Sequence, residues 1–218
     1  MRWLVLSLRV CDSFHMKKPA LIALLTLLAI PLHAADVSDL SYDAGGDTVI
    51  ITDCDEAASG SLVIPDTIEG KPVTSIGASA FAGCSYLTSI KIPEKVTSIG
   101  IYVFSNCKRL KSIIIPDSVT SIGFSAFSRC TSLTSINIPN SVINIERFAF
   151  SSCESLTHLK IGDKVNCIGQ SAFIGCYSLA WVTLGRGLIN IKPFAFGNCR
   201  RLKSITIPEN VTMIGKRA

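Results

Sequence analysis

The sequence predicts a mainly β fold, a solenoid of 23-residue coils with parallel sheets and short 3-10 or helical turns. Three observations lead to this prediction. Phe, Cys and Leu recur every 23 residues, each copy contains a short alternation of apolar and polar residues, and Pro or Gly follows that alternation. The phenylalanines that mark the six copies are Phe81, Phe104, Phe127, Phe150, Phe173 and Phe196.

Residues 87–92 form the expected strand of the first strict copy. Leu87, Ile90 and Ile92 are apolar and the residues between them are polar, which indicates a strand with one buried face. Pro93 follows at once. Because proline has no N–H to donate to a sheet, the strand is expected to end there.

Two further short segments complete each coil. Residues 96–99 are a second β-rich run, and residues 80–84, with the pattern AFxxC, predict a tight helical or 3-10 turn. Gly follows the second run in most copies, but Glu146 and Lys192 replace it in two of them. This backbone position is therefore expected to tolerate an ordinary φ.

A single copy cannot bury its apolar side chains. Stacked copies place Phe on Phe, Cys on Cys and Ile on Ile, which gives a continuous core. With neighbouring strands about 4.8 Å apart, six coils are expected to form a sheet about 25 to 30 Å long.

The pattern LxxIxI, followed by IP, VTSIG and AFxxC, resembles the BspA-like leucine-rich repeat family over roughly residues 61–214. The resemblance implies a leucine-rich-repeat solenoid in a secreted or surface-exposed protein of a bacterium or a protist. Several members of that family are linked to adhesion to host proteins or to other cells. Adhesion or protein binding is thus what the resemblance implies for this chain.

Residues 1–34 are predicted to be a leader that contains a secretory signal peptide. Two lysines directly after Met16 precede an apolar run at residues 20–30, and small residues near Ala34 offer a cleavage site. The run is too short to span a bilayer. We expect the true start to be Met16, and a mature protein that is secreted or on the cell surface, without a transmembrane segment.

The remaining chain is expected to divide into a cap and a repeat region. Residues 35–60 are interpreted as the N-terminal cap, because end units of a solenoid shield its core, and a Gly-Gly pair there predicts a hairpin. Residues 61–218 hold the repeats, with an inserted loop at residues 68–72. No C-terminal cap is visible, and the favoured explanation is a natural chain that continues past Ala218.

Composition argues against nucleic-acid binding. The chain is 48% hydrophobic and 17% charged, which suits a buried ladder with a Ser/Thr surface. The formal net charge is +5, but the first 34 residues hold four Lys/Arg and one Asp. The rest has 17 basic and 15 acidic residues, a net charge of +2, so the basic excess lies largely in the leader.

The cysteines are expected to be structural. Six of the nine occupy one repeat position beside Phe, which favours free, buried thiols over disulfides. A straight row of thiols cannot surround zinc tetrahedrally, so neither a metal nor another cofactor is expected. The pairing of Cys54 and Cys167, which lie outside the row, stays open.

No catalytic constellation is visible, so the protein is not expected to be an enzyme. His15 and His33 fall in the leader, and His158 occupies a polar strand position that is expected to face solvent. Carboxylates such as Asp117 follow the Pro turn, where they are ordinary loop residues, and no paired carboxylates or phosphate-binding loop are found.

The outward strand positions offer a candidate binding face. One row comprises Ser89, Ser112, Ser135, His158, Trp181 and Ser204, and the other Lys91, Ile114, Asn137, Lys160, Thr183 and Thr206. Trp181, His158, Lys160 and Ile114 are the predicted patch for a protein or glycan ligand. Two alternatives stay open: the rows are only a solvated sheet with a chance Trp, or the protein is a non-binding spacer or a fragment of a larger surface protein.

Overall fold

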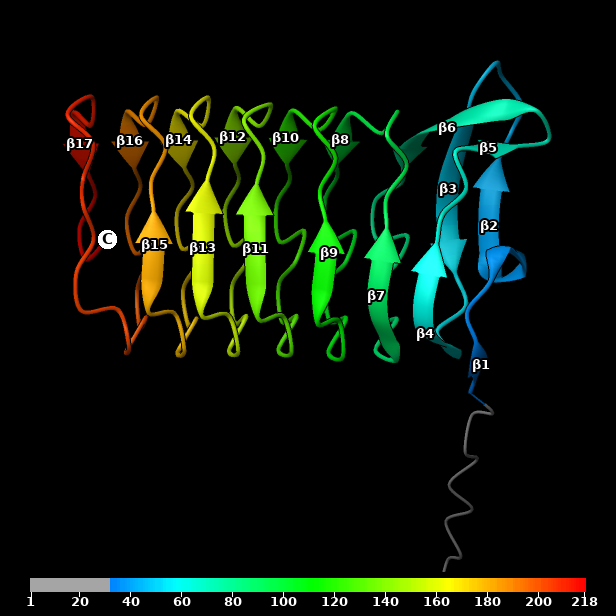
Figure 1. The fold of residues 1–218 in the computed structure, drawn as a ribbon, viewed down its shortest axis with the longest axis horizontal. Coiled ribbons are helices and arrows are strands. Elements are labelled where there is room, and N and C mark those ends of the chain that lie inside the picture. Colours follow the sequence, from blue (N-terminus) through cyan, green and yellow to red (C-terminus); the bar gives the residue numbers. More distant parts are fainter. Residues whose placement is uncertain (1–31) are drawn as a thin grey trace, which may run out of the picture. The chain divides into compact units, whose positions relative to one another are not determined.

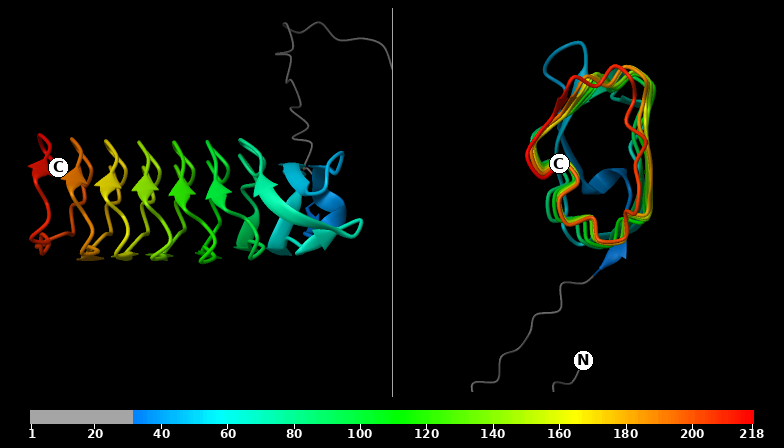
Figure 2. Two further views of the ribbon diagram at one scale, coloured as in Figure 1. Left: turned by 90° about the horizontal axis from the view of Figure 1, so that it is seen from above. Right: turned by 90° about the vertical axis from the view of Figure 1, so that its left-hand side faces the viewer.

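The computed structural model describes residues 32–218, and all but the last three residues of the leader predicted at residues 1–34 lie outside this part. Residues 32–218 form a single compact unit. Its coils follow one another along one axis, and seen end-on they superpose as a closed outline (Figures 1 and 2). Within residues 32–218, no helix has the length and apolar character needed to cross a membrane.

One strand of each coil lies on the face that carries the two polar rows. Most neighbouring strands pair in parallel, with residues 23 apart opposite each other, as in the pairs Ser89–Ser112 and His158–Trp181. The first pair has a shifted register, with Ser61 opposite Ser89, and the strands divide into two sheets between Ile114 and Ser135. The series is β4 (Ala58–Val63), β7 (Leu87–Lys91), β9 (Ser112–Ile114), β11 (Ser135–Ile138), β13 (His158–Ile161) and β15 (Trp181–Thr183). The strand predicted at residues 87–92 is confirmed, and β7 ends shortly before Pro93.

A second series of two-residue strands runs along another side of the coils (Figure 1). Each strand covers only the last two residues of the second predicted run. In the first strict copy, for example, the run was predicted at residues 96–99 and the strand is Ser98–Ile99. Together with β6 (Lys71–Ile76), β3 (Val49–Cys54), β2 (Leu40–Asp43) and β5 (Thr67–Ile68), which pairs with β6, they form a ten-stranded sheet. The strands are β8 (Ser98–Ile99), β10 (Ser121–Ile122), β12 (Asn144–Ile145), β14 (Cys167–Ile168), β16 (Asn190–Ile191) and β17 (Met213–Ile214).

The N-terminal part is joined to the solenoid through its sheets. β2 (Leu40–Asp43) and β3 (Val49–Cys54) form the predicted antiparallel hairpin, and β3 continues the solenoid sheet by pairing in parallel with β6 (Lys71–Ile76). The insertion is also a hairpin, because β5 (Thr67–Ile68) is antiparallel to β6. A short 3-10 helix, η1 (Val37–Asp39), precedes β2, and β1 (His33–Ala34) pairs with β4.

The AFxxC segment consists of successive turns. Their hydrogen bonds span three residues, as in a 3-10 helix: the N–H of Ala82 donates to the carbonyl of Ser79 at 2.7 Å and that of Cys84 to Phe81 at 3.2 Å. Two residues per coil have positive φ and interrupt any regular helix. They include Ser79, Tyr102, Asn106, Ser125, Arg129, Phe148, Ser152, Ser171, Phe194 and Asn198, with Gly83 and Gly175.

The same segment ties neighbouring coils together. Alternate N–H groups donate to the next coil, as from Phe104 to the carbonyl of Ala126 at 2.8 Å and from Phe127 to Ala149 at 2.7 Å. Because the left-handed residues turn alternate peptide groups along the solenoid axis, a turn segment can bond to its neighbour as a strand does. The Gly after the second run is not among the positive-φ residues, which confirms the ordinary φ inferred from Glu146 and Lys192.

The phenylalanines form the predicted column. Successive rings from Phe81 to Phe196 lie with centroids 5.3, 5.2, 5.0, 5.1 and 5.4 Å apart, and the last three pairs are within 6° of parallel. The first five rings are fully buried, while Phe196 at the C-terminal end is only half-buried. Ring-on-ring stacking along a continuous core confirms that burial requires the neighbouring coil.

The cysteines form a second buried column beside the rings. The thiol of Cys107 donates to the carbonyl of Phe81 at 3.1 Å, and Cys130 donates likewise to Phe104 at 3.1 Å. This contact with the preceding coil recurs at Cys153, Cys176 and Cys199. All eight described cysteines are free. This agrees with the free thiols expected for the six of the repeat row, and it answers the open question for Cys54 and Cys167, which are also unpaired.

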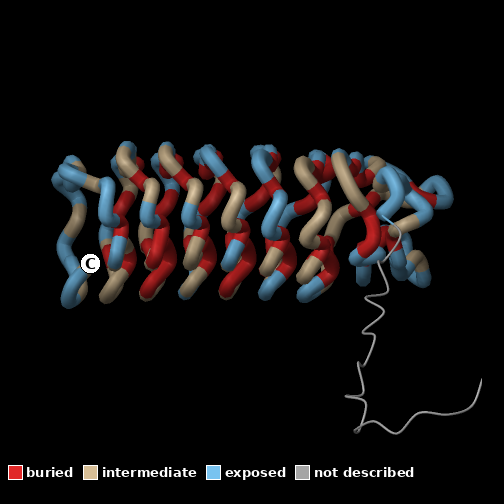
Figure 3. Tube along the Cα trace, turned by 90° about the horizontal axis from the view of Figure 1, so that it is seen from below, coloured by how far each residue is buried: buried red, intermediate tan, exposed pale blue. Residues whose placement is uncertain are grey.

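The last coil is less buried than the others. None of residues 200–218 is fully buried, and in Figure 3 this coil lacks the red segments seen in the preceding ones. Ile207, Met213 and Ile214 are exposed. Phe196, Leu202 and Ile214 line a hollow of about 250 Å³ at this end.

Candidate binding face

The strand face brings three of the four predicted residues together. β13 and β15 are paired in register, with His158 opposite Trp181 and Lys160 opposite Thr183. Along β13, Leu159 points into the core while His158 and Lys160 are exposed, as expected for alternating strand residues. His158, Lys160 and Trp181 line one hollow of about 280 Å³, together with Ser135 and Asn137 among others.

The fourth predicted residue, Ile114, lies on the same face but outside this hollow. It belongs to β9, and β11 separates it from β13. Ile114 is 74% exposed and Trp181 is 68% exposed. Large apolar side chains this accessible suit interface anchors, but the two do not form one contiguous patch.

His158 is held in a defined orientation. Its Nδ1 lies 2.8 Å from Oγ1 of Thr157, and that hydroxyl donates to the carbonyl of Thr134 at 2.9 Å. Because the hydroxyl has one hydrogen, which goes to the carbonyl, Nδ1–H is the donor to Oγ1. The free Nε2 is then left for solvent or a ligand.

A larger hollow lies on the C-terminal side of Trp181. It has a volume of about 790 Å³ and is lined by Trp181, Arg200, Arg201 and Lys203, with Ser204 and Thr206 among others. The three basic residues were not among the predicted site residues, because sequence reasoning considered only the two outward rows of the strand. A signal existed, since the equivalent residues of the second copy are also basic: Lys108, Arg109 and Lys111.

This hollow forms because the last coil does not continue the sheet. Among the described residues, no strand pairs with β15 on its C-terminal side, and residues 203–207 have no strand structure. Every earlier coil has a strand on this face. The C-terminal edge of β15 therefore has no strand partner among the described residues, as is also the case for β9.

The charged side chains around Trp181 are mainly basic. Neither hollow beside Trp181 has an Asp or Glu in its lining. In the part of the chain that the structure describes, the only ion pair within 4 Å joins His33 and Asp39, so the lysines and arginines here have no such carboxylate partner. Arg200 instead lies over the ring of Tyr177 at 4.9 Å. Lys160 also borders a third hollow, of about 390 Å³, whose lining includes Asp117.

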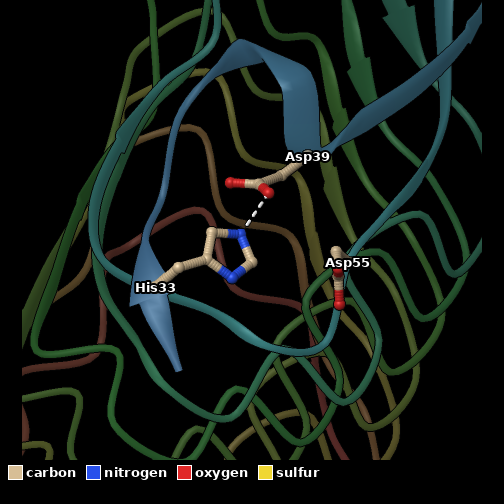
Figure 4. A group of neighbouring side chains, drawn as sticks. All are labelled: His33, Asp39 and Asp55. Carbon is tan, nitrogen blue, oxygen red and sulfur yellow. Dashed lines mark hydrogen bonds and ion pairs between the residues drawn. The ribbon is translucent and has the colours of Figure 1, made fainter. Parts of the chain in front are cut away.

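A separate cluster lies near the N-terminal end. Ligand atoms of His33, Asp39 and Asp55 lie within 4.8 Å of one another, a set that could hold a metal ion (Figure 4). His33 hydrogen-bonds Asp39, and this bond raises the pKa of the imidazole. Asp39 also accepts from the N–H of Asp36 at 2.8 Å, which caps η1. His33 falls within the leader predicted at residues 1–34, and cleavage near Ala34 would remove it from the cluster.

The stacked coils, the parallel strand face and the buried Phe and Cys columns define an extended leucine-rich-repeat solenoid. Comparison with known families gives the same result. Six copies of the repeat match the family described as BspA type leucine rich repeat region, over residues 60–179 and 99–218. The chain belongs to this family.

Solved structures of bacterial leucine-rich repeat proteins are similar to the chain. A leucine-rich repeat protein of T. pallidum is 33% identical with a TM-score of 0.77, covering 84% of this chain and 86% of that one. A leucine rich cell surface protein of Faecalibacterium prausnitzii is 34% identical, with a TM-score of 0.72 over 85% of this chain and 51% of that one.

A third similar structure is a leucine-rich repeat protein of Bacteroides ovatus. It is 30% identical with a TM-score of 0.58, over 81% of this chain and 54% of its own. The chain thus spans about half the length of two of these three relatives. None of the curated proteins compared with the chain matches it.

Proposed function

We propose that the protein is a secreted or cell-surface binding module that holds a protein or glycan on the strand face around Trp181. The observation that carries the proposal is the exposed indole, 68% accessible, on a paired strand between two hollows. A large aromatic group on a rigid element loses little conformational freedom on binding, which suits an interface anchor. On this proposal the protein is a scaffold and not an enzyme.

The proposed location is supported by the sequence and by a relative. Residues 1–34 combine a basic start with an apolar run and small residues, as a secretory signal does. The Faecalibacterium prausnitzii relative is described as a cell surface protein. Adhesion to another cell or to a host surface is the activity that fits such a location and an extended face.

The binding proposal is tested by replacing Trp181→Ala and measuring capture of the purified protein on cell surfaces or on a glycan array. We expect capture to fall about tenfold, as for a central aromatic anchor. Ile189→Ala is the control, because Ile189 is 43% exposed and lines neither hollow beside Trp181. Equal capture by both variants and by the unmodified protein contradicts the proposal.

A non-binding spacer is the second candidate. It is favoured by the hydroxyl-rich rows, in which Ser89, Ser112, Ser135 and Ser204 occupy equivalent outward positions, as on a solvated sheet. A spacer has no ligand of its own, so the capture experiment would then show only background binding for every variant.

A further inference from the structure

Basic side chains lie on both sides of Trp181. On the β13 side, His158 and Lys160 share a hollow with the indole, and on the C-terminal side Arg201 and Lys203 share the larger one. Neither lining includes a carboxylate, so an anionic group of a partner would meet cations in both hollows without an opposing negative charge. Charge complementarity therefore favours an anionic ligand.

The arrangement also restricts how a ligand can lie. Trp181 is opposite His158 across the β13–β15 pair, whereas Arg201 and Lys203 belong to the next coil. A chain that contacts both basic groups must cross the strands along the solenoid axis. A peptide added to the edge of β15 would instead run along the strand and meet the basic residues on one side only.

We propose that this site, here called the Trp181 cleft and comprising His158, Lys160, Trp181, Arg201 and Lys203, binds an anionic polysaccharide. The apolar face of a sugar ring stacks on the indole, and sulfate or carboxylate groups bind the basic side chains on either side. Hydroxyls of Ser135, Ser204 and Thr206, which line the same hollows, are available to the sugar hydroxyls. This inference rests on the proposed function and names the ligand class of the same face.

The test is a titration calorimetry series with defined glycans. A heparin oligosaccharide carries sulfates, an oligogalacturonate carries only carboxylates, and dextran is the uncharged reference. We expect at least one anionic glycan to bind and dextran not to bind, with affinity falling as salt rises from about 0.05 to 0.3 M. The two anionic arms show which acidic group is preferred. Equal binding of dextran, or no binding of either anionic glycan, overturns the proposal.

The repeat supplies a matched pair of charge variants. Lys203 and Lys111 occupy the same position of different coils, and both are exposed, but only Lys203 lines a hollow with Trp181. We expect Lys203→Glu to weaken glycan binding about tenfold and Lys111→Glu to have a much smaller effect, because a localised site needs its own cations. Equal losses of glycan affinity in the two variants would mean that the glycan is attracted by the overall positive charge, and would overturn the proposed site at the Trp181 cleft.

Two further measurements separate the remaining outcomes. The first measurement uses polyglutamate. If polyglutamate binds as tightly as the best glycan, and Lys203→Glu weakens its binding by the same factor, the ligand is an acidic peptide and the polysaccharide proposal is wrong. If Trp181→Ala abolishes capture on surfaces while no anionic glycan binds, the ligand class is wrong and the proposed function stands. If Trp181→Ala changes neither capture nor glycan binding, both proposals fail. Circular dichroism of each variant checks that the fold is retained.

Discussion

The buried cysteine of each coil is a small hydrogen-bond donor that also fills the core. The thiol of Cys153 donates to the carbonyl of Phe127 at 3.2 Å, a bond that Ala could not make. Sequence reasoning predicted the burial, because the six residues share one position beside Phe. The partner of the thiol was not predictable, because it depends on the backbone of the preceding coil.

Alkaline pH is expected to destabilise the fold through these thiols. Burial raises the pKa of Cys153, and it raises the pKa of Cys199 to about 12. In the unfolded chain the thiols ionise near pH 8.5, so the stabilisation is complete below that pH and is lost as pH rises toward the folded pKa. Urea unfolding at pH 7.5 and at pH 10 measures this loss, with about 1.4 kcal/mol per pH unit for each such thiol.

Cys153→Ala provides the control for other titrating groups. Its free energy of unfolding should fall less between the two pH values than that of the unmodified protein, because one buried thiol has been removed. If the free energy of unfolding falls by the same amount in the two proteins, the loss of stability at alkaline pH comes from Lys or Tyr side chains and not from this thiol.

The turn segment is where element-level prediction was weakest. The strands could be placed from the alternation of Leu87, Ile90 and Ile92, and the hairpin from its Gly-Gly pair. The left-handed residues were missed because their repeat position holds different residue types. Two copies have Arg129 and Ser152 there, which do not indicate positive φ. The other copies have Gly83, Asn106, Gly175 and Asn198. Gly and Asn tolerate positive φ, so four of the six copies did carry the signal.

Arg129 offers a test of the backbone requirement at the turn. Its φ is +61° and its side chain is exposed, so a substitution there acts mainly through the backbone. Arg129→Val should destabilise the protein by about 1 to 2 kcal/mol, because a β-branched residue is strained in the left-handed region. Arg129→Gly should not, and urea unfolding of both variants measures the difference. Equal stability of the two would mean that the turn relaxes to negative φ.

At the scale of the whole molecule, stability is expected to depend on position along the stack. Phe127 is fully buried between Phe104 and Phe150, whereas Phe196 is half-buried and stacks on Phe173 alone. In a solenoid each coil contacts only its neighbours, so an end coil can separate without unfolding the rest. The opening beside β15 was not predicted, because the repeat pattern predicts a strand in every copy, whereas residues 203–207 have no strand structure.

A pair of truncations tests this gradient. Phe127→Ala should lower the free energy of unfolding by about 3 to 5 kcal/mol, as for a fully buried aromatic ring. Phe196→Ala should lower the free energy of unfolding clearly less, and it should increase local opening of the last coil only. Urea unfolding measures the first effect, and hydrogen exchange locates the second. Equal global destabilisation would show that the stack unfolds as one unit.

The regular offset between coils has an evolutionary consequence. Copying 23 residues of the gene at a coil boundary would insert a coil whose two sides already match their new neighbours. A duplication ahead of Phe150 would carry Trp181 about 4.8 Å further from the N-terminal hairpin and leave its immediate surroundings intact. Length can therefore change in equal steps of one coil, while the strand face around Trp181 keeps its neighbouring residues.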